Sequence, residues 1–427
     1  MTRVLMGVVL LAGCGARSGL LEGSDPPSGD GPRPRGDAPL VADTFSTPDA
    51  RRSCTTDADC ATGNPCIGST CSPAGTCVDR PLPMGQVKEL SFSGLLGMGA
   101  GAGSLAHGLV RTQNTLSAQP FSLDGPAGGD TLLGTVDGTR PWDSAIAAVP
   151  GGLAMVTSVK GGLELRLSSK PGAMDRLESS GIFVRLAPSG SRLVATSDLG
   201  HNCGVAWADA TTGKWTTKSS SMPGGCTGAS LPHPKGGMTG LPPYIYPAGF
   251  SQGGAAILLS VASDGKVTRL TAASDGSLKK DGLSLASAGS GPKYFHSLVA
   301  AQGGGGVGAL WCRTESADSK TTQVNMALLD GGSLEPLGPV STQTVKGQFR
   351  PYAFYMDMLF CEGRYVGIWY DGSGGAAWQL GPDGQPLGPV LRFGHALDIA
   401  RIDAVCVKGG VVVFAASGAV TLRCPGV

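Results

Sequence analysis

Turn-forming glycines divide most of this chain into short apolar runs. From about residue 86 onward, runs rich in Val, Leu, Ile and Ala alternate with Gly-Gly, Asp-Gly and Ser-Gly pairs, and no long stretch has the apolar spacing of a helix. With 69 Gly and 30 Pro among 427 residues, turn signals come too often for helices of ordinary length. The pattern fits short strands joined by tight turns, so residues 86–427 are predicted to be all-β.

The apolar runs recur in groups of four. The clearest unit, residues 294–339, has runs at 295–301, 307–312 and 323–329 and a weaker fourth strand near Leu334. Four-stranded units with a period of roughly 40 to 50 residues are typical of the blades of a β-propeller. A glycine marks the turn between the first and second run of each unit, at intervals of 38 to 64 residues: Gly152, Gly190, Gly254, Gly305, Gly363 and Gly410.

The number of blades follows from the number of units. Six marked turns and a less regular unit at 90–123 predict a β-propeller of seven four-stranded blades. Six or eight blades remain alternatives, because residues 219–241 are either a long loop or the remains of strands. Residues 87–92 are expected to add an outer strand to the last blade, beside its final strand at 420–424, which would remove two open sheet edges.

The repeats resemble those of bacterial lipoproteins with degenerate propeller domains, which carry Asp-Gly turns late in each blade. Asp330-Gly331 and Asp383-Gly384 stand at such places in this chain. Residues 209–215 resemble the repeat of quinone-binding propeller dehydrogenases, but the stretch occurs once here, whereas that family repeats it in blade after blade. We interpret it as a hairpin whose Trp215 packs between blades, and we expect no cofactor.

The chain begins like an exported lipoprotein. Residues 4–12 form an apolar run after one positive charge, and the run is too short to span a bilayer, which requires roughly twenty apolar residues. The run ends in Leu11-Ala12-Gly13-Cys14, which resembles the lipobox of bacterial lipoproteins. The resemblance implies that residues 1–13 are a signal peptide and that Cys14 is lipidated and anchored in a membrane. An ordinary secretion signal with an incidental cysteine is the alternative.

The residue after the lipobox cysteine bears on the destination. In lipoproteins of this kind, Gly15 in place of an aspartate implies the outer membrane, although the rule varies among bacteria. We therefore expect a lipid-anchored protein of the cell envelope. The sequence leaves open whether the protein faces the periplasm or the cell surface.

Two segments separate the expected anchor from the propeller. Residues 14–52 are rich in Gly, Pro, Ser and Asp, with almost no large apolar residue, so they are expected to form a disordered tether. Residues 53–80 contain five cysteines without a Cys-x-x-Cys pair, which in an exported chain indicates a small disulfide-rich module rather than a zinc site. The segment resembles the small Cys-rich modules that follow the tether in many secreted bacterial proteins, and we expect a spacer or a minor interaction module.

The cysteine count is odd once the lipidated residue is set aside. At least one of the remaining eleven thiols is therefore unpaired or bonded to another chain. Closeness in sequence makes Cys203 with Cys226, and Cys406 with Cys424, the first expected pairs, although sequence does not determine connectivity. The disulfide candidates are Cys54, Cys60, Cys66, Cys71, Cys77, Cys203, Cys226, Cys312, Cys361, Cys406 and Cys424.

Aromatic and charged residues gather where the first strand of each predicted blade begins. In a propeller these first strands surround a central channel, so the turns that lead into them share one face of the ring. Aromatic rings beside charges suit sugars, peptides or protein side chains, whereas in the plainer interpretation each aromatic residue caps its own blade. The candidate ligand face consists of Trp142, Asp143, Tyr244, Tyr294, His296, Arg350, Tyr352 and His395.

No motif in the sequence indicates catalysis, a metal site or nucleic-acid binding. The five histidines have no ligand spacing, no Gly-x-Ser-x-Gly turn occurs, and 33 basic and 32 acidic residues form no basic stripe. We therefore expect a non-catalytic binding or scaffold protein that engages a protein or a glycan. The alternative is an extracellular polysaccharide hydrolase or lyase with its carboxylates in the channel. The sequence leaves the oligomeric state open.

Overall fold

The structure is a computed structural model, and its described part is all-β. Apart from one 3₁₀ helix, η1 (Asp57–Cys60), the regular elements in this part are strands. The described residues are 52–102, 104–135, 144–160, 162–178, 182–198, 204–217, 220–221, 230–232, 238–240, 245–250, 254–261, 267–275, 277–281, 294–314, 321–346, 355–371, 374–394 and 401–425.

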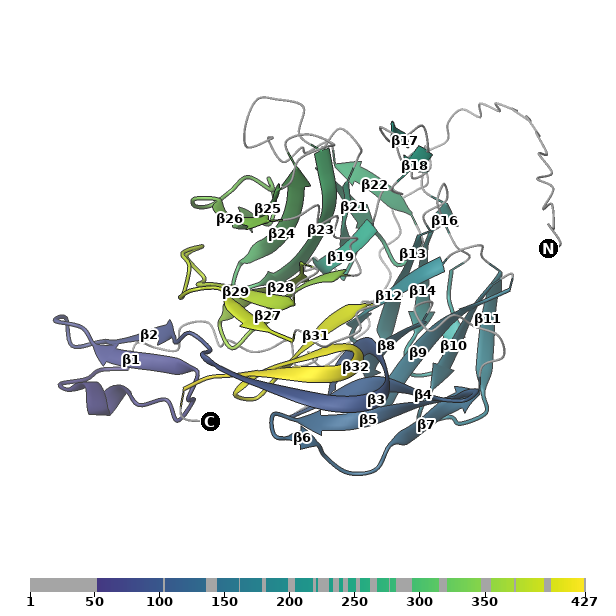
Figure 1. The fold of residues 1–427 in the computed structure, drawn as a ribbon, viewed down its shortest axis with the longest axis horizontal. Helices are drawn as coiled ribbons and strands as arrows, with labels where there is room; N and C mark the ends of the chain where they lie inside the picture. Colours follow the sequence, from purple (N-terminus) through teal and green to yellow (C-terminus); the bar gives the residue numbers. More distant parts are fainter. Residues whose placement is uncertain are drawn as a thin grey trace, which may run out of the picture. The chain divides into compact units, whose positions relative to one another are not determined.

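The strands form seven antiparallel blades within the described residues (Figure 1). Blades are numbered here in chain order, and in each the first strand is the innermost. Blade 1 contains the second part of β3 (Gln86–Ala102) with β4 (Leu105–Thr112), β5 (Thr115–Ser122), β6 (Gly125–Pro126) and β7 (Thr131–Thr135). Blade 2 contains β8 (Ser144–Val149), β9 (Gly152–Val159), β10 (Gly162–Leu167) and β11 (Met174–Glu178). Blade 3 contains β12 (Ile182–Ser189), β13 (Arg192–Asp198), β14 (Gly204–Asp209), β15 (Lys214–Trp215) and β16 (Ser220–Ser221).

The remaining blades repeat the same pattern. Blade 4 contains β19 (Ile245–Phe250), β20 (Ala256–Val261), β21 (Val267–Ala272) and β22 (Leu278–Asp281). Blade 5 contains β23 (Tyr294–Gly303), β24 (Gly306–Thr314), β25 (Thr321–Asp330) and β26 (Ser341–Lys346). Blade 6 contains β27 (Met356–Cys361), β28 (Arg364–Tyr370), β29 (Gly375–Leu380) and β30 (Leu391–Phe393). Blade 7 contains β31 (Ile402–Val407) and β32 (Gly410–Arg423), and a separate pair, β17 (Ser230–Pro232) and β18 (Met238–Gly240), lies between blades 3 and 4 in the sequence.

The innermost strands close into a ring. β3, β8, β12, β19, β23, β27 and β31 each contact the next in this order, and β31 contacts β3 again. The six turn glycines predicted from sequence all lie between the first and second strands of their blades or at the start of the second. The prediction of a seven-bladed propeller is therefore confirmed for the described residues.

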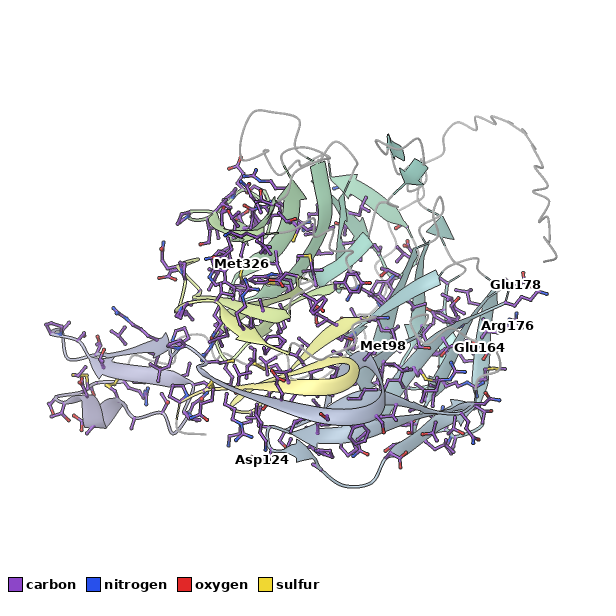
Figure 2. All side chains as sticks on the ribbon, in the orientation of Figure 1. Met98, Asp124, Glu164, Arg176, Glu178 and Met326 are labelled. Atoms are coloured by element: carbon purple, nitrogen blue, oxygen red, sulfur yellow. A yellow bond between two sulfur atoms is a disulfide. The ribbon has the colours of Figure 1, made fainter. Side chains whose placement is uncertain are left out.

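The two ends of the propeller meet in blade 7. The first part of β3 pairs with the last part of β32, from Gln86 opposite Arg423 to Ser91 opposite Gly418. β32 folds back on itself, since the Cys424 amide donates to the Gly409 carbonyl at 3.0 Å. Arg423 also pairs with Asp124 of blade 1, which is labelled in Figure 2. The predicted closure of the last blade by an N-terminal strand is confirmed.

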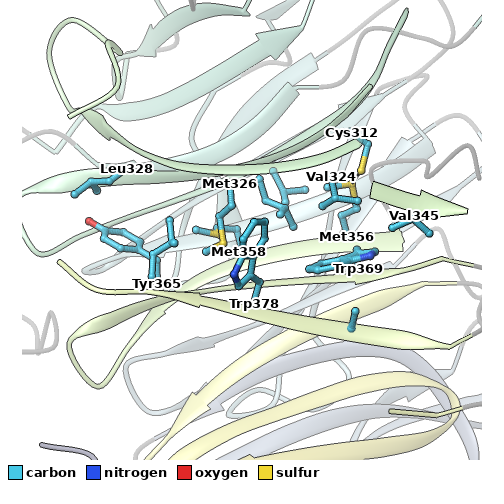
Figure 3. Packing of buried hydrophobic residues seen from close by; sticks show 14 residues of the cluster. Cys312, Val324, Met326, Leu328, Val345, Met356, Met358, Tyr365, Trp369 and Trp378 are labelled. Carbon is cyan, nitrogen blue, oxygen red and sulfur yellow. Dashed lines mark hydrogen bonds between the residues drawn. The ribbon is translucent and has the colours of Figure 1, made fainter. Parts of the chain in front are cut away.

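The hydrophobic core consists of clusters between neighbouring blades. Seven clusters of buried residues are present among the described side chains, and each lies at one of the seven interfaces of the ring. Figure 3 shows the cluster between blades 5 and 6, where Met326 and Val324 face Tyr365, Trp369 and Trp378. A blade thus buries both of its faces only when it has a neighbour on each side.

Glycines within the strands make room for aromatic rings of the next blade. A Cβ at Gly308 would lie 2.3 Å from Cδ1 of Tyr365, and a Cβ at Gly99 would lie 2.3 Å from Cδ2 of Phe414. Glycine at these positions thus allows adjacent sheets to approach closely.

Aspartate side chains accept hydrogen bonds in the turns after the third strand of several blades. Oδ1 of Asp330 accepts hydrogen bonds from the amides of Gly332 and Ser333 at 2.9 and 2.7 Å, and the bonds from Ser333 lower the pKa of Asp330. Asp209, Asp275 and Asp383 accept from backbone amides in the same way, each at the end of the third strand of its blade or in the turn that follows. At Asp209 this produces the predicted hairpin, and Trp215 packs against the cluster between blades 2 and 3.

The Cys-rich module is joined to the propeller. It contains the hairpin of β1 (Ile67–Cys71) and β2 (Cys77–Pro81), closed by disulfides Cys54–Cys71 and Cys60–Cys77. A third disulfide connects Cys66 to Cys424, the residue that follows the last strand of blade 7. The module is therefore part of the ring closure and is more than a simple spacer.

Buried polar side chains of blade 6 hold the same junction. Arg364 has no exposed surface and donates to the carbonyl oxygens of Cys66, at 2.6 Å, and Leu82. Gln379 exchanges two hydrogen bonds with the backbone of Met84, at 2.9 and 3.0 Å. These bonds satisfy the backbone of the segment that leads from the module into β3.

Two sequence expectations are wrong. The fourth strand of blade 5 is β26, because Leu334 has a φ of 57° in the preceding turn and its buried side chain packs between blades 4 and 5. Cys406 pairs with Cys361 of blade 6, not with Cys424, since the neighbour of Cys406 across the sheet is Val411. Cys312 is a buried free thiol, in agreement with the odd count. Cys203 and Cys226 lie outside the described residues.

Replacing Cys66 and Cys424 together by Ser should lower the free energy of unfolding by about 2–5 kcal/mol, because the bridge spans 358 residues and holds the closing blade. Chemical denaturation without reductant measures the change. As a matched control, Cys54→Ser with Cys71→Ser removes a bridge across 17 residues inside the module. The control should leave the main transition unchanged, and an equal loss in both variants would contradict the closing role.

Candidate functional site

A cavity of about 750 Å³ lies among the innermost strands. Its described walls come from β3, β8, β12, β27 and β31, which belong to blades 1, 2, 3, 6 and 7. The volume falls within the range of about 300–1,000 Å³ that is usual for small-molecule sites. This central channel is the candidate functional site.

The backbone of the channel walls needs hydrogen-bonding partners. The innermost strand of each blade is a sheet edge, so the N–H and C=O groups on its channel side lack a strand partner. Buried backbone groups of this kind require hydrogen bonds from side chains or water. Charged side chains of β27 and β31 supply several of them.

Two aspartates accept hydrogen bonds from inner-strand amides. Asp357 accepts from its own neighbour Met358 at 2.8 Å and from Ala404 of blade 7 at 2.6 Å, one bond to each carboxylate oxygen. Asp403 accepts from Gly99 of blade 1 at 3.1 Å through Oδ2. The two carboxylates thereby link blade 6 to blade 7 and blade 7 to blade 1.

Arg401 provides the complementary donors. Its guanidinium donates to the Ser144 carbonyl of blade 2 at 2.7 Å and to the Val184 carbonyl of blade 3 at 3.2 Å, and the residue is only 4% exposed. Arg185 of β12 lines the same cavity and is partly exposed. Two cations and two carboxylates therefore converge on the described part of the channel.

The charged residues lie at one end of the channel. Asp357 and Asp403 are the second residues of their strands, Arg401 comes directly before β31, and its partner Ser144 is the first residue of β8. We call this end, where the inner strands begin, the strand-start face. The described lining of the opposite end includes Ala148, Pro188 and Phe360 and is apolar.

The surroundings of Asp403 alter its ionisation. Desolvation in the channel wall and the nearby Asp357 carboxylate raise the pKa of Asp403 to about 7, while Arg401, Arg185 and the Gly99 amide act in the opposite direction. A perturbed carboxyl in a cavity is a recognised mark of functional sites, although structural charge networks produce it too.

The predicted ligand-face residues flank this end in sequence. Tyr294 and His296 lie in the first part of β23, the inner strand of blade 5, and their side chains are outside the described set. The other six, Trp142, Asp143, Tyr244, Arg350, Tyr352 and His395, lie outside the described residues altogether. The proposed face therefore stays a prediction.

Sequence reasoning missed the four charged channel residues. The available signal was a charge inside an apolar first strand, as in Met356-Asp357-Met358 and Arg401-Ile402-Asp403. In a period-2 strand such a charge faces either solvent or the channel, and only the packing of the blades decides between them.

The described residues do not assemble an open metal site. The sulfur atoms of Cys54, Cys60 and Cys77 lie within 4.8 Å of one another, but all three belong to disulfides and are not thiolate ligands. Helices able to cross a membrane are absent from the part of the chain described here.

Comparison with known proteins supports the fold. No protein-family model and no curated protein matches the sequence. Among solved structures, the BP39L lectin from Burkholderia pseudomallei is similar, with 14% identity over 80% of this chain and 97% of the lectin and a TM-score of 0.50. The WD40 domain of Toxoplasma gondii coronin has 11% identity over 81% of this chain and 88% of that domain, with a TM-score of 0.49. Identities this low concern the fold alone, and the fold is a β-propeller.

Replacing Asp403 by Asn should change the pH dependence of stability. The raised pKa means that the folded chain holds this proton more tightly than the unfolded chain, so the carboxyl favours folding below about pH 4, and this contribution is lost as the pH rises to about 7. The melting temperature of Asp403→Asn should therefore rise relative to wild type between pH 5 and pH 8.

Thermal unfolding across this range measures the effect, with Glu178→Gln on the exposed outer strand β11 as the control (Figure 2). If the Asp403→Asn and Glu178→Gln variants follow wild type with the same pH dependence, Asp403 is not a perturbed carboxyl.

Proposed function

We propose that the protein is a lipid-anchored binding propeller of the bacterial cell envelope, which holds a protein or glycan ligand at the strand-start face. In this proposal Cys14 carries the lipid, residues 14–52 act as a tether, and the Cys-rich module sets the propeller at the end of the tether. The outer membrane is the proposed location.

The observation that carries the binding role is the convergence of charges from three blades at one end of a channel about 750 Å³ in volume. The residues of the predicted ligand face precede or begin inner strands in the sequence, which supports this same end as the binding end. A rigid ring with a polar cavity and turns around it suits recognition, because the blades hold the turns in place.

A polysaccharide hydrolase or lyase is the second candidate, and one observation favours it. Asp403 has a raised pKa and lies near Asp357, as a carboxyl pair for glycoside cleavage requires. Against this, both oxygens of Asp357 accept backbone hydrogen bonds, which hold that carboxylate in the wall of the channel. Binding without bond cleavage fits these contacts better.

Changing Trp142, Tyr244 and Tyr352 together to Ala should weaken ligand binding at least about tenfold, because aromatic contacts dominate recognition surfaces. An array of glycans, peptidoglycan fragments and envelope proteins, probed with the full-length chain in detergent, identifies the ligand and measures the loss. Leu132→Ala, at an exposed apolar position on outer strand β7, is the control. Unaltered binding in the triple variant would reject the predicted ligand face, and absence of any binding would reject the binding role. Release of reducing ends from a polysaccharide, abolished by Asp403→Asn, would favour the enzyme candidate.

The proposed lipidation of Cys14 can be tested separately. Replacing Cys14 by Ser should abolish incorporation of a labelled fatty acid and move the protein from the membrane fraction to the soluble fraction, since no acyl chain can be attached. Labelling in a producing bacterium followed by fractionation measures both effects, with Ser18→Ala in the tether as the control. Fatty-acid incorporation into the Cys14→Ser variant would contradict the lipobox interpretation.

A further inference from the structure

Two disulfides of the Cys-rich module lie against each other. The sulfur atoms of Cys54, Cys60 and Cys77 are all within 4.8 Å of one another, and Cys71 is bonded to Cys54. Both the Cys54–Cys71 and the Cys60–Cys77 bond therefore belong to one group, which we call the four-sulfur cluster. Among the described side chains, no other group of three cysteine sulfurs is packed this closely.

The hairpin brings Cys71 and Cys77 side by side at the ends of β1 and β2 nearest the turn (Figure 1). The Cys71 amide donates to Oδ1 of Asp57 at 2.7 Å, and the Cys77 amide donates to the Arg52 carbonyl at 2.9 Å. Since neither amide donates across the hairpin, Cys71 and Cys77 form a non-hydrogen-bonded pair, in which opposite side chains come closest. The usual spacing of such a pair, about 4.5 Å between Cα atoms, lies within the range of disulfides.

The four residues differ in exposure. Cys54 and Cys60 are buried, with exposed fractions of 8% and 0%, whereas Cys71 and Cys77 are partly exposed. The two residues of the ring-closing disulfide, by contrast, have no exposed surface. Because thiol–disulfide exchange requires access to a sulfur, a thiol in solution meets the four-sulfur cluster before it meets the ring-closing bond.

We propose that the four-sulfur cluster is a thiol–disulfide exchange site with two arrangements of its bonds. One arrangement is that of the structure, and the other joins Cys54 to Cys60 and Cys71 to Cys77. The reaction partner is a small-molecule thiol, because the partial exposure of Cys71 and Cys77 favours it over a cysteine of a folded protein. This inference goes beyond the proposed binding function and depends on neither the ligand face nor the lipid anchor.

The exchange balances in atoms and electrons. The thiolate of the small thiol attacks the Cys71 sulfur, forms a mixed disulfide there and releases the Cys54 thiolate. This thiolate attacks the adjacent Cys60 sulfur, forms the Cys54–Cys60 bond and releases the Cys77 thiolate. The Cys77 thiolate then attacks the mixed disulfide, forms the Cys71–Cys77 bond and releases the small thiol unchanged. No oxidant or reductant is consumed, and entry at Cys77 gives the same products by the mirrored steps.

The second arrangement changes how the start of the module is held. Both disulfides of the structure join residues 54–60 to the hairpin, whereas each exchanged bond lies within one of the two segments. Hydrogen bonds, such as that from the Cys54 amide to the Gly75 carbonyl at 2.9 Å, then hold residues 54–60 to the hairpin without covalent support. Exchange thus loosens the module where the expected tether enters it, and the ring-closing bond is retained.

Cys71→Ser tests the central transfer without any added thiol, because it leaves the Cys54 thiol beside the intact Cys60–Cys77 bond. The dilute full-length protein is incubated at about pH 8, near the usual pKa of a thiol. The free thiol should move from Cys54 to Cys60 or Cys77 in at least about one molecule in ten, because the bonds exchanged are of the same kind. Acid stops the exchange, N-ethylmaleimide labels the free thiols in denaturant, and mass spectrometry maps the label.

Cys361→Ser is the matched control, since it frees one thiol, that of Cys406, and leaves the four-sulfur cluster intact. Its label should stay at Cys406. Circular dichroism and the main melting transition confirm that both variants are folded. A label confined to Cys54 in Cys71→Ser would overturn the inference, and equal spreading of the label in both variants would do so too, because it would indicate general scrambling.

The wild-type chain tests the approach of a small thiol. Reduced glutathione below the protein concentration should produce the Cys54–Cys60 and Cys71–Cys77 bonds, with a transient glutathione adduct at Cys71 or Cys77, and should leave Cys66–Cys424 intact. Appearance of these two bonds supports the inference. An unchanged cluster, or loss of the Cys66–Cys424 bond before any change in the cluster, would overturn it and would leave the proposed binding function standing.

Discussion

Burial of every sheet between two neighbours is the constraint on which this structure depends. The seven buried clusters lie between blades, and no blade has an independent core among the described side chains. A missing neighbour would expose one apolar face, for example the Trp369 and Trp378 face of blade 6. Each blade therefore depends on the closed ring for its stability, and ring closure affects every blade interface.

The closing blade is reinforced accordingly. β3 completes blade 7 and continues into blade 1, so one strand joins the two ends of the ring. The Cys66–Cys424 disulfide and the buried Arg364 then fix the segment just before β3. This arrangement places the Cys-rich module at the point where the ring closes, directly after the expected tether.

The channel reflects the same architecture. When the ring closes, the inner strands surround the channel as sheet edges, and their channel-side N–H and C=O groups have no strand partner. Charged side chains at the strand-start face form hydrogen bonds with several of these groups. Asp357 and Arg401 are buried and bind the inner-strand backbone, whereas Asp403 and Arg185 are partly exposed. A structural requirement of the closed ring thus creates a polar cavity at the strand-start face.

The sequence by itself determined the all-β class, the blade period and the closing strand. Turn formation by glycine and strand formation by apolar runs depend on neighbouring residues only, so both can be recognised without the tertiary structure. It also predicted the hairpin at Asp209. The disulfide partners of Cys406 and Cys424 and the fourth strand of blade 5 were decided by tertiary structure. The same holds for the channel charges: Asp357, Asp403, Arg185 and Arg401 are far apart in sequence, and only the packing of blades around the ring brings them to one cavity.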